Sequence, residues 1–246
     1  MIVGRVAALW RYPVKSMLGE RLERASLGLG GIEGDRGFAL RDPTNGRVLS
    51  AKKVSRLLEA RARTDGRTVR ITLPTGDELD AEEPGAASER ISAWLGRTVE
   101  LARPSGDERP VVEDEEGVFR GRAGGFFDSS VVHFVSTSTL ERLGEFHPKG
   151  RWDPRRFRPN VVIETLDAGF VEESWIGGTL RIGSAAVEIT KPCSRCIMTT
   201  HAQDDLPVDR DVLRAVREHN EDHVGVYGIV RESGTVSVGD DALLTL

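Results

Sequence analysis

The sequence holds few cysteines and few aromatic residues, and it has no long apolar run. Its two cysteines are three positions apart, so they cannot form a disulfide scaffold. No window approaches the ~18 consecutive apolar residues of a transmembrane helix, and the start lacks the features of a signal peptide. The formal net charge of -5 argues against a nucleic-acid or anionic-membrane partner. We therefore expect a cytoplasmic protein, because thiols stay reduced there.

The patterning of the chain favours a mostly β fold with a few helices. Alternating or short apolar segments between turn residues predict strands at 2–12, 20–27, 35–41, 47–51, 60–63, 68–73, 98–102, 131–135, 161–163, 180–190, 224–230 and 235–246. Helical spacing occurs at 54–60, 86–95, 140–143 and 206–219, and Ser136 marks the start of the third of these helices. We expect a long surface loop at 103–125. The elements do not alternate as βαβ units, so a barrel-based α+β fold is expected.

Both cysteines lie in the segment 191–200, directly after the strand predicted at 180–190. Because Pro192 cannot donate to a β-ladder, we expect the strand to end there and both thiols to lie in a loop. Arg195 stands between the cysteines and places a positive charge beside each sulfur, which favours the thiolate. This pattern is more typical of a metal ligand or nucleophile than of an inert thiol.

Three other interpretations of the cysteines remain open. Two buried structural thiols are one of them, since free cysteine packs well in cores. A thioredoxin-like pair is another, although that site begins a helix in a βαβ unit. A zinc site completed by His219 and His223 is the third, but 22 residues separate Cys196 from His219, more than in a finger-type site.

Cations and hydroxyl groups recur at predicted strand ends and turns, where a β scaffold presents its site. Side chains of these two kinds bind phosphate and other polyanions when they converge. The candidates are Lys15, Ser16, Arg36, Ser129, Ser130, Arg158, Asn160, Ser194 and Arg195. His133 is expected to be a satisfied strand residue, and His147 and His201 are expected in polar loops.

Several motifs resemble the MOSC superfamily, and within it the amidoxime reducing components of mitochondria and their bacterial relatives. Residues 12–16 (Tyr-Pro-Val-Lys-Ser) and 34–36 (Gly-Asp-Arg) resemble its N-terminal β-barrel. Residues 157–163, 172–175 (Glu-Glu-Ser-Trp) and 193–200 (Cys-Ser-Arg-Cys-Ile-Met-Thr-Thr) resemble the MOSC domain. The resemblance implies an N-terminal barrel at 1–100 packed on a MOSC β-barrel at 101–246. At 201–207 this chain departs from the turn that relatives often carry.

The resemblance also implies a site for the molybdenum–pterin cofactor. Cys196 falls on the metal-ligating position and is the implied catalytic residue, whereas Cys193 becomes a neighbour. The implied cofactor contacts are Lys15, Ser16, Arg36, Asp128, Ser129, Ser130, Arg158, Asn160, Ser194, Arg195 and Tyr227. A soft thiolate suits molybdenum. At the level of the family, the resemblance also carries an association with pyridoxal phosphate.

The implied activity is reduction of a small N-hydroxylated or N-oxygenated substrate by oxygen-atom transfer. The sequence shows no flavin or haem motif, so the electrons are expected from a separate cytochrome b5-like, ferredoxin-like or flavin reductase partner. An alternative is a non-catalytic carrier of the cofactor, or of sulfur on Cys196. Cys196 fits both activities.

Overall fold

The computed structural model describes residues 1–65, 67–104, 111–114, 117–120 and 125–246, which form two compact units. The barrel unit comprises Met1–Trp10, Arg21–Glu33 and Ser130–Leu246. The second unit comprises Arg11–Glu20 and Gly34–Ser129. The division at residue 100 that the sequence predicts stays a prediction.

The barrel unit is built on a closed β-barrel. Going around it, the order is β1-β13-β12-β16-β15-β14-β18, and β1 pairs with both β13 and β18. The barrel strands are β1 (Ile2–Arg11), β12 (Val132–Ser136), β13 (Val161–Thr165), β14 (Thr179–Ile182), β15 (Ala185–Ser194), β16 (His223–Glu232) and β18 (Asp241–Thr245). All these pairings are antiparallel except that of β12 with β13. Closure removes the unpaired sheet edges that an open sheet would expose.

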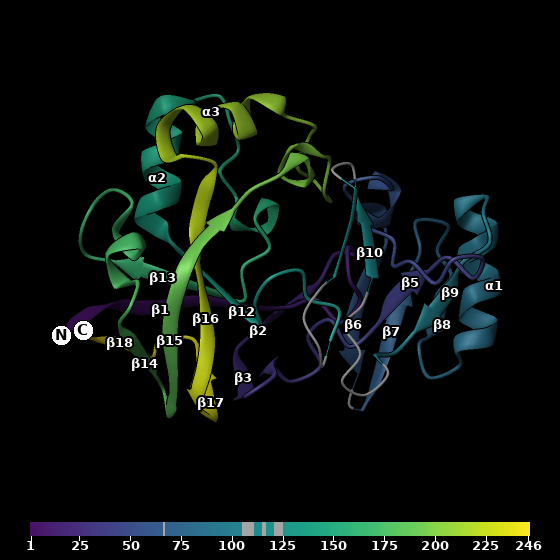
Figure 1. The fold of residues 1–246 in the computed structure, drawn as a ribbon, viewed down its shortest axis with the longest axis horizontal. Helices are drawn as coiled ribbons and strands as arrows, with labels where there is room; N and C mark the ends of the chain where they lie inside the picture. The colour runs from purple at the N-terminus through teal and green to yellow at the C-terminus, as the bar shows by residue number, and fades with distance from the viewer. Residues whose placement is uncertain (66, 105–110, 115–116, 121–124) are drawn as a thin grey trace. The chain divides into compact units, whose positions relative to one another are not determined.

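Helices cover one end of the barrel, where α2 (Thr137–Phe146) lies beside α3 (Arg210–Asn220) in Figure 1. Leu143 of α2 and Val216 of α3 are fully buried in one cluster with strand residues Val135 and Val224. Burying a side chain of this kind contributes about 1.5–3 kcal/mol. The cluster also contains Phe157, which follows the short helix η2 (Pro154–Arg156). The helix pair is thus joined to the loop that precedes β13.

The remaining elements of the barrel unit are short. A three-stranded sheet has the order β17-β3-β4, and β2 extends the barrel sheet beyond β1. These elements are β2 (Glu20–Leu22), β3 (Arg24–Gly28), β4 (Gly31–Ile32), β17 (Gly234–Ser237) and the 3-10 helices η3 (Val171–Trp175) and η4 (Ile197–Thr200). The two termini lie together, because the Met1 ammonium donates to the Leu244 carbonyl at 2.7 Å (Figure 1).

The second unit consists of small antiparallel sheets with one α-helix among its described residues. The sheets are β6-β7-β8, β5-β9 and β10-β11. Its elements are β5 (Ala39–Arg41), η1 (Ser55–Glu59), β6 (Arg61–Asp65), β7 (Thr68–Thr72), β8 (Glu78–Asp80), α1 (Pro84–Leu95), β9 (Glu100–Ala102), β10 (Val111–Asp114) and β11 (Gly117–Arg120). Helix α1 ends at Gly96, whose φ of 70° is the left-handed cap that glycine adopts without strain.

The predicted fold class is confirmed, with corrections to individual elements. The strands predicted at 20–27 and 235–246 are each two strands, β2 with β3 and β17 with β18. The strand predicted at 180–190 is two strands, β14 and β15, separated by a turn. The loop predicted at 103–125 contains the hairpin of β10 and β11, and its other positions from 105 to 124 lie outside the described residues. The return strand predicted at 47–51 is reduced to a single bridge of Arg41 with Val48. Helix α3 begins at Arg210 rather than near 206, because Asp209 caps its first turn.

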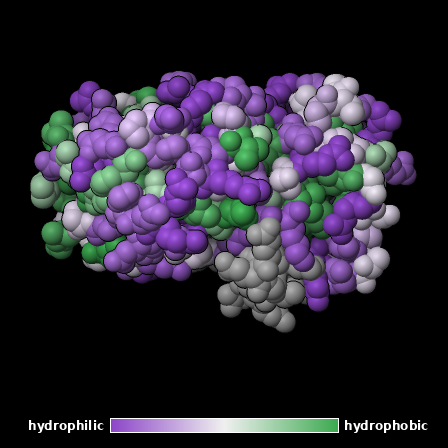
Figure 2. All heavy atoms as spheres, turned by 90° about the horizontal axis from the view of Figure 1, so that it is seen from above, coloured by the Kyte–Doolittle hydropathy of each residue, from purple (hydrophilic) through white to green (hydrophobic). Residues whose placement is uncertain are grey.

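Hydrophilic residues predominate on the face drawn in colour in Figure 2, where hydrophobic residues form small separate groups. Among the described residues, the large hydrophobic side chains that stay exposed are Met1, Ile2, Leu29, Phe146, Leu166, Val208, Leu243 and Leu246. None of the helices in the described part of the chain is long and apolar enough to cross a lipid bilayer.

Candidate functional site

The two cysteines lie in different surroundings, which corrects the prediction that both thiols sit in a loop. Strand β15 continues through Pro192 to Ser194, so Cys193 is a strand residue and is fully buried. The ladder with β16 shifts register between Pro192 and Ser194, and such an irregularity tolerates a residue without an N–H. Cys196 lies beyond the strand and is half-buried. Cys196 is therefore the accessible thiol.

The Cys193 sulfur is surrounded by donors and positive charge. Arg195 donates from Nη1 to Cys193 Sγ at 2.8 Å. Burial alone would raise the pKa of this thiol, but the Arg195 charge, together with His133 and a hydrogen bond from Tyr227, lowers it to about 6. These surroundings favour the thiolate form of Cys193.

His133 reaches this cluster because the backbone of β16 comes unusually close to β12. A Cβ on Gly225 would lie 2.1 Å from the Phe134 carbonyl oxygen and 2.6 Å from His133 Nε2, so only glycine fits. His133 Nε2 also lies 3.0 Å from the Val224 carbonyl oxygen. The prediction that His133 is a satisfied strand residue is confirmed, although its place beside Cys193 could not be read from the sequence.

Arg195 links the cysteine strand to the loop before β13. Its Nη2 donates to the Phe157 carbonyl at 2.9 Å, its backbone N–H donates to the Asp222 carbonyl at 2.6 Å, and its guanidinium lies 5.6 Å from the Phe157 ring centroid. The pKa of Arg195 is raised, because the charges of Cys193, Tyr227 and Cys196 outweigh burial. Its buried Nε has no acceptor among the residues that the structure describes. This N–H could donate to a bound ligand.

Cys196 is the residue directly before η4. The backbone N–H and the Oγ1 of Thr199 both donate to the Cys196 carbonyl, at 3.1 and 3.0 Å. These bonds hold the backbone of Cys196 and do not involve its thiol.

In the second unit, three cations surround one carboxylate. Lys15 Nζ donates to the Asp128 carboxylate and, at 3.1 Å, to the Phe126 carbonyl. Burial raises the pKa of Asp128, but the charges of Lys15, Lys52 and Arg36 outweigh burial and place it below its ordinary value. Lys52 was not predicted, because a lysine in a polar turn carries no distinguishing pattern.

Arg36 and Ser16 are fixed by bonds within the second unit. The Arg36 guanidinium pairs with the Asp35 carboxylate and lies over the rings of Tyr12, at 5.1 Å, and Phe127, at 5.7 Å. The Oγ of Ser16 accepts from the backbone N–H of Ala51 at 3.0 Å. Both side chains are held in defined positions, so little conformational entropy remains to be lost when they bind a ligand.

Backbone strain coincides with the predicted site residues. Ser16, Arg36 and Arg158 have φ values of 68°, 50° and 54°, in the left-handed region that non-glycine residues seldom occupy. Among the described residues, the others of this kind are Asp204, Glu221 and Asp222. Strain of about 1–3 kcal/mol per residue persists where the surrounding structure imposes it, and it clusters at functional sites. Three of the six described residues of this kind are thus predicted site residues.

The other predicted site residues have more varied surroundings. Ser130 donates to the Gly228 carbonyl at 2.7 Å. The buried Asn160 joins two strands, since its Oδ1 accepts from the His133 N–H at 3.2 Å and its Nδ2 donates to the Trp10 carbonyl at 3.4 Å. Ser194 is exposed, whereas Ser129 and Tyr227 are half-buried. The structure therefore shows a structural function for Asn160 and gathers Arg195 and Tyr227 around Cys193.

The histidines do not complete a zinc site with the cysteines. His219 is in α3 and stacks on Phe146 at 3.7 Å, while His223 begins β16. Within the part of the chain that the structure describes, the side chains close enough to share a cation are His147, Asp209 and Asp211. The zinc interpretation of Cys196 with His219 and His223 is thus not supported.

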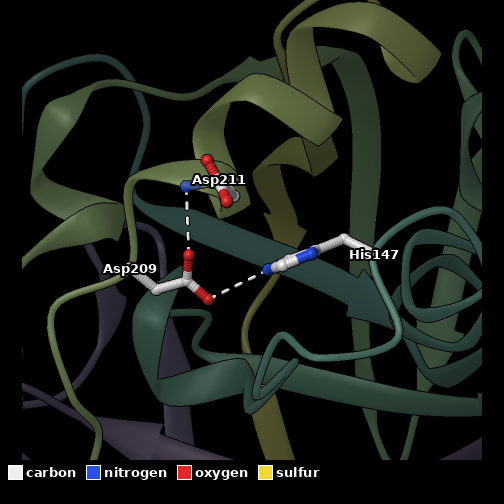
Figure 3. A group of neighbouring side chains, drawn as sticks. All are labelled: His147, Asp209 and Asp211. Carbon is white, nitrogen blue, oxygen red and sulfur yellow. Dashed lines mark hydrogen bonds and ion pairs between the residues drawn. The ribbon is translucent and has the colours of Figure 1, made fainter.

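The group of His147, Asp209 and Asp211 has a structural explanation. Figure 3 shows the Asp209 carboxylate between its two partners. One oxygen accepts from the Asp211 N–H at 3.0 Å and caps α3, while the other lies 3.1 Å from His147 Nε2 at the end of α2. The Asp209 side chain thus joins the end of α2 to the start of α3. The group was not predicted, because His147 and Asp209 are 62 positions apart.

Comparison with known proteins gives matches along the whole chain. A family model described as the MOSC domain matches residues 122–242, and one described as the MOSC N-terminal beta barrel domain matches residues 3–109. The chain is similar to mitochondrial amidoxime-reducing component 1 of Homo sapiens, at 27% identity over 98% of this chain and 83% of that protein. The Mus musculus protein of the same name is 26% identical over 98% of this chain and 82% of its own length.

A solved structure is also similar. The crystal structure of the YUAD protein from Bacillus subtilis aligns with a TM-score of 0.53 at 15% sequence identity, covering 98% of this chain and 94% of that chain. At this identity the likeness shows the fold alone.

Proposed function

Because this chain belongs to the MOSC family, with a MOSC domain preceded by a MOSC N-terminal β-barrel domain, we propose that it is a molybdenum-cofactor oxidoreductase that reduces N-hydroxylated compounds. Its relatives include proteins named as amidoxime-reducing components, and this relation supports the oxidoreductase class. A small N-hydroxylated or N-oxygenated base is the proposed substrate.

The observation that carries the proposal is the accessible thiol of Cys196 beside a guanidinium with an unused donor. A soft thiolate is a suitable ligand for molybdenum. The Nε of Arg195 is buried and lacks an acceptor among the described residues, so a bound group with acceptor atoms would satisfy it. The residues present therefore fit a metal–pterin group with a thiolate ligand.

The proposed division of labour follows the chemistry of each side chain. Cys196 would hold the metal, and the fixed charge of Arg195 would favour its thiolate form. Cations of the second unit, Lys15 and Arg36, would bind anionic oxygens of the cofactor. The further proposed contacts are Ser16, Asp128, Ser129, Ser130, Arg158, Asn160, Ser194 and Tyr227.

The cofactor would supply two-electron oxygen-atom transfer, so that an N-hydroxylated base, two electrons and two protons give the reduced base and water. The protein's residues seat the cofactor and leave the substrate access to it. The electrons are proposed to come from a separate cytochrome b5-like, ferredoxin-like or flavin reductase protein. A cytoplasmic location and the family-level association with pyridoxal phosphate stay expectations.

The test is the metal content of the purified protein after expression in a host that makes the molybdenum cofactor. We expect near-stoichiometric molybdenum in the wild type and in Cys193→Ser, and its loss in Cys196→Ser. The loaded wild type should then reduce benzamidoxime with a reduced viologen. Molybdenum without turnover would identify a carrier instead of an enzyme. Zinc, or no metal at all, would overturn the cofactor assignment.

A further inference from the structure

A fully buried arginine, Arg156, binds the chain segment that follows Cys196. Its guanidinium donates to four backbone carbonyls: Nε to Arg151 at 3.0 Å, Nη1 to Thr199 at 3.2 Å and to His201 at 3.4 Å, and Nη2 to Pro207 at 2.9 Å. Its side chain has no exposed surface. Buried arginines usually have a carboxylate partner, whereas all four of these acceptors are peptide carbonyls.

Three of the four acceptors belong to one segment, residues 196–207, which we call the thiol segment. Thr199, whose carbonyl accepts from Arg156, itself donates twice to the Cys196 carbonyl, at 3.1 and 3.0 Å. The buried cation is therefore two hydrogen-bonded links from the backbone of Cys196. The regular structure of the thiol segment is η4 and a bridge between Gln203 and Leu206. The bonds from Arg156 add contacts to the segment's backbone at Thr199, His201 and Pro207.

A second guanidinium makes the reciprocal connection. Arg195, just before the thiol segment, donates to the Phe157 carbonyl at 2.9 Å, while Arg156, the neighbour of Phe157, donates into the thiol segment. Arg195 therefore donates to the backbone beside Arg156, and Arg156 donates to the backbone of the thiol segment that follows Arg195. Arg158, whose φ of 54° marks a strained backbone, lies in the same short stretch as Arg156.

We propose that Arg156 is a positioning residue that fixes the thiol segment and, through Thr199, the place of Cys196. A planar fork with five N–H donors reaches carbonyls on several sides at once, which a lysine ammonium on a flexible stem does not. Loss of this side chain leaves four carbonyls without their donor in a buried site, and the segment must open to water to satisfy them.

The effect on catalysis rests on the proposed function, because it requires that Cys196 hold the metal. With a mobile thiol segment, the thiolate would spend less time in the productive geometry, and a misplacement of about 1 Å can cost about 100-fold in rate. We expect kcat to fall further than KM rises, since Arg156 itself does not touch the substrate.

The test compares Arg156→Met and Arg156→Lys with the wild type. Arg181→Met is the matched control, because Arg181 is an exposed arginine of the same unit with two bonds to Glu232, at 2.9 Å each. The readout is amide hydrogen exchange in the cofactor-free protein. Peptides covering 196–207 should exchange at least about tenfold faster in Arg156→Met, with an intermediate rate in Arg156→Lys. Peptides from α2 and β16 should stay at wild-type rates, as should all peptides of Arg181→Met.

Exchange at the wild-type rate in 196–207, or faster exchange spread evenly over the barrel unit, would overturn the proposal. If Arg156→Met does not fold, Arg156→Lys carries the comparison. The kinetic experiment then uses benzamidoxime and reduced viologen on the molybdenum-loaded variants at a temperature where all are folded. A wild type without reductase activity would refute the proposed function while leaving the exchange result intact. Localised exchange with an unchanged kcat would refute the link to catalysis alone.

Discussion

Two sulfurs three residues apart in the sequence occupy opposite environments. Cys193 is fully buried inside β15, and its thiolate has Arg195, His133 and Tyr227 as neighbours. Cys196 lies half-buried just before η4, with its carbonyl held by Thr199. The difference teaches that the spacing of two cysteines does not assign them one shared role. Cys193 is a buried partner of the Arg195 guanidinium, and Cys196 presents a thiol.

Thiol labelling tests the difference in accessibility between Cys193 and Cys196 most directly, and it has the largest expected effect. In the folded cofactor-free protein, Cys196 should react with a disulfide reagent at least about 100-fold faster than Cys193, because a buried thiol reacts only after local opening. The measurement is the rate of thiol release in Cys193→Ser, which reports Cys196, and in Cys196→Ser, which reports Cys193. Equal rates in the two variants would contradict the assigned environments, and equal rates in denaturant are the control.

Much of the barrel could be predicted from the sequence because its strands carry local apolar patterns. Alternation identified β1, short apolar runs identified β12 and β13, which are buried along most of their length, and the serine before α2 identified the helix start, where Ser136 Oγ accepts from the Thr139 N–H at 3.0 Å. Such signals are local, so they survive without knowledge of the fold. The turn that splits β14 from β15 was missed because the apolar pattern continues across it.

The site could be predicted only in part. Lys15 and Arg36 were candidates from their places in predicted turns, whereas only the resemblance to a family assigned the metal to Cys196, and these roles stay predictions. Arg156 was missed, and the place of the predicted strand residue His133 beside Cys193 was not foreseen. Their partners Thr199 and Val224 lie more than 40 and 90 positions away in the sequence. The prediction that the strand ends at Pro192 was wrong, because a register shift in the ladder accommodates the proline within β15.

The pH dependence of stability sharpens the comparison at Cys193. Its pKa is lowered in the folded protein to about 6, from an ordinary 9.0. An acidic group whose pKa is lower in the folded state than in the unfolded state stabilises the fold fully above its unfolded-state pKa. This contribution is lost as the pH falls towards the folded-state pKa. Between pH 6 and 9 the wild type should therefore gain about 2–4 kcal/mol of unfolding free energy relative to Cys193→Ser.

Urea unfolding under reducing conditions at pH 6, 7, 8 and 9 measures this gain. Cys196→Ser is the control and should follow the wild-type slope, since its substitution leaves the buried thiolate in place. Parallel curves for wild type and Cys193→Ser would show that Cys193 is not a buried thiolate.

The smallest expected effect concerns the boundary of the thiol segment, where Asp209 donates its N–H to the Thr200 carbonyl at 2.9 Å. Burial raises the pKa of Asp209, but hydrogen bonds from His147 and the Asp211 N–H, with the charges of His147 and Arg156, outweigh burial and lower it. Asn is as good a helix cap as Asp, so Asp209→Asn removes the charge and keeps the cap. We expect a loss of about 0.5–1 kcal/mol at pH 7.

The sign of the pH dependence distinguishes this charge effect from a packing defect. Because the folded pKa of Asp209 is depressed, its contribution is present above the unfolded pKa of about 3.9 and disappears as the pH falls through the folded value. The gap between wild type and Asp209→Asn should therefore close in thermal unfolding below about pH 4. Asp211→Asn, which removes an exposed partner of Arg214 at 3.0 Å, should cost less than Asp209→Asn at pH 7. If the stability difference between wild type and Asp209→Asn persists at low pH, the loss comes from packing and not from the Asp209 charge. The contrast between Cys193 and Cys196 would then not depend on this helix cap.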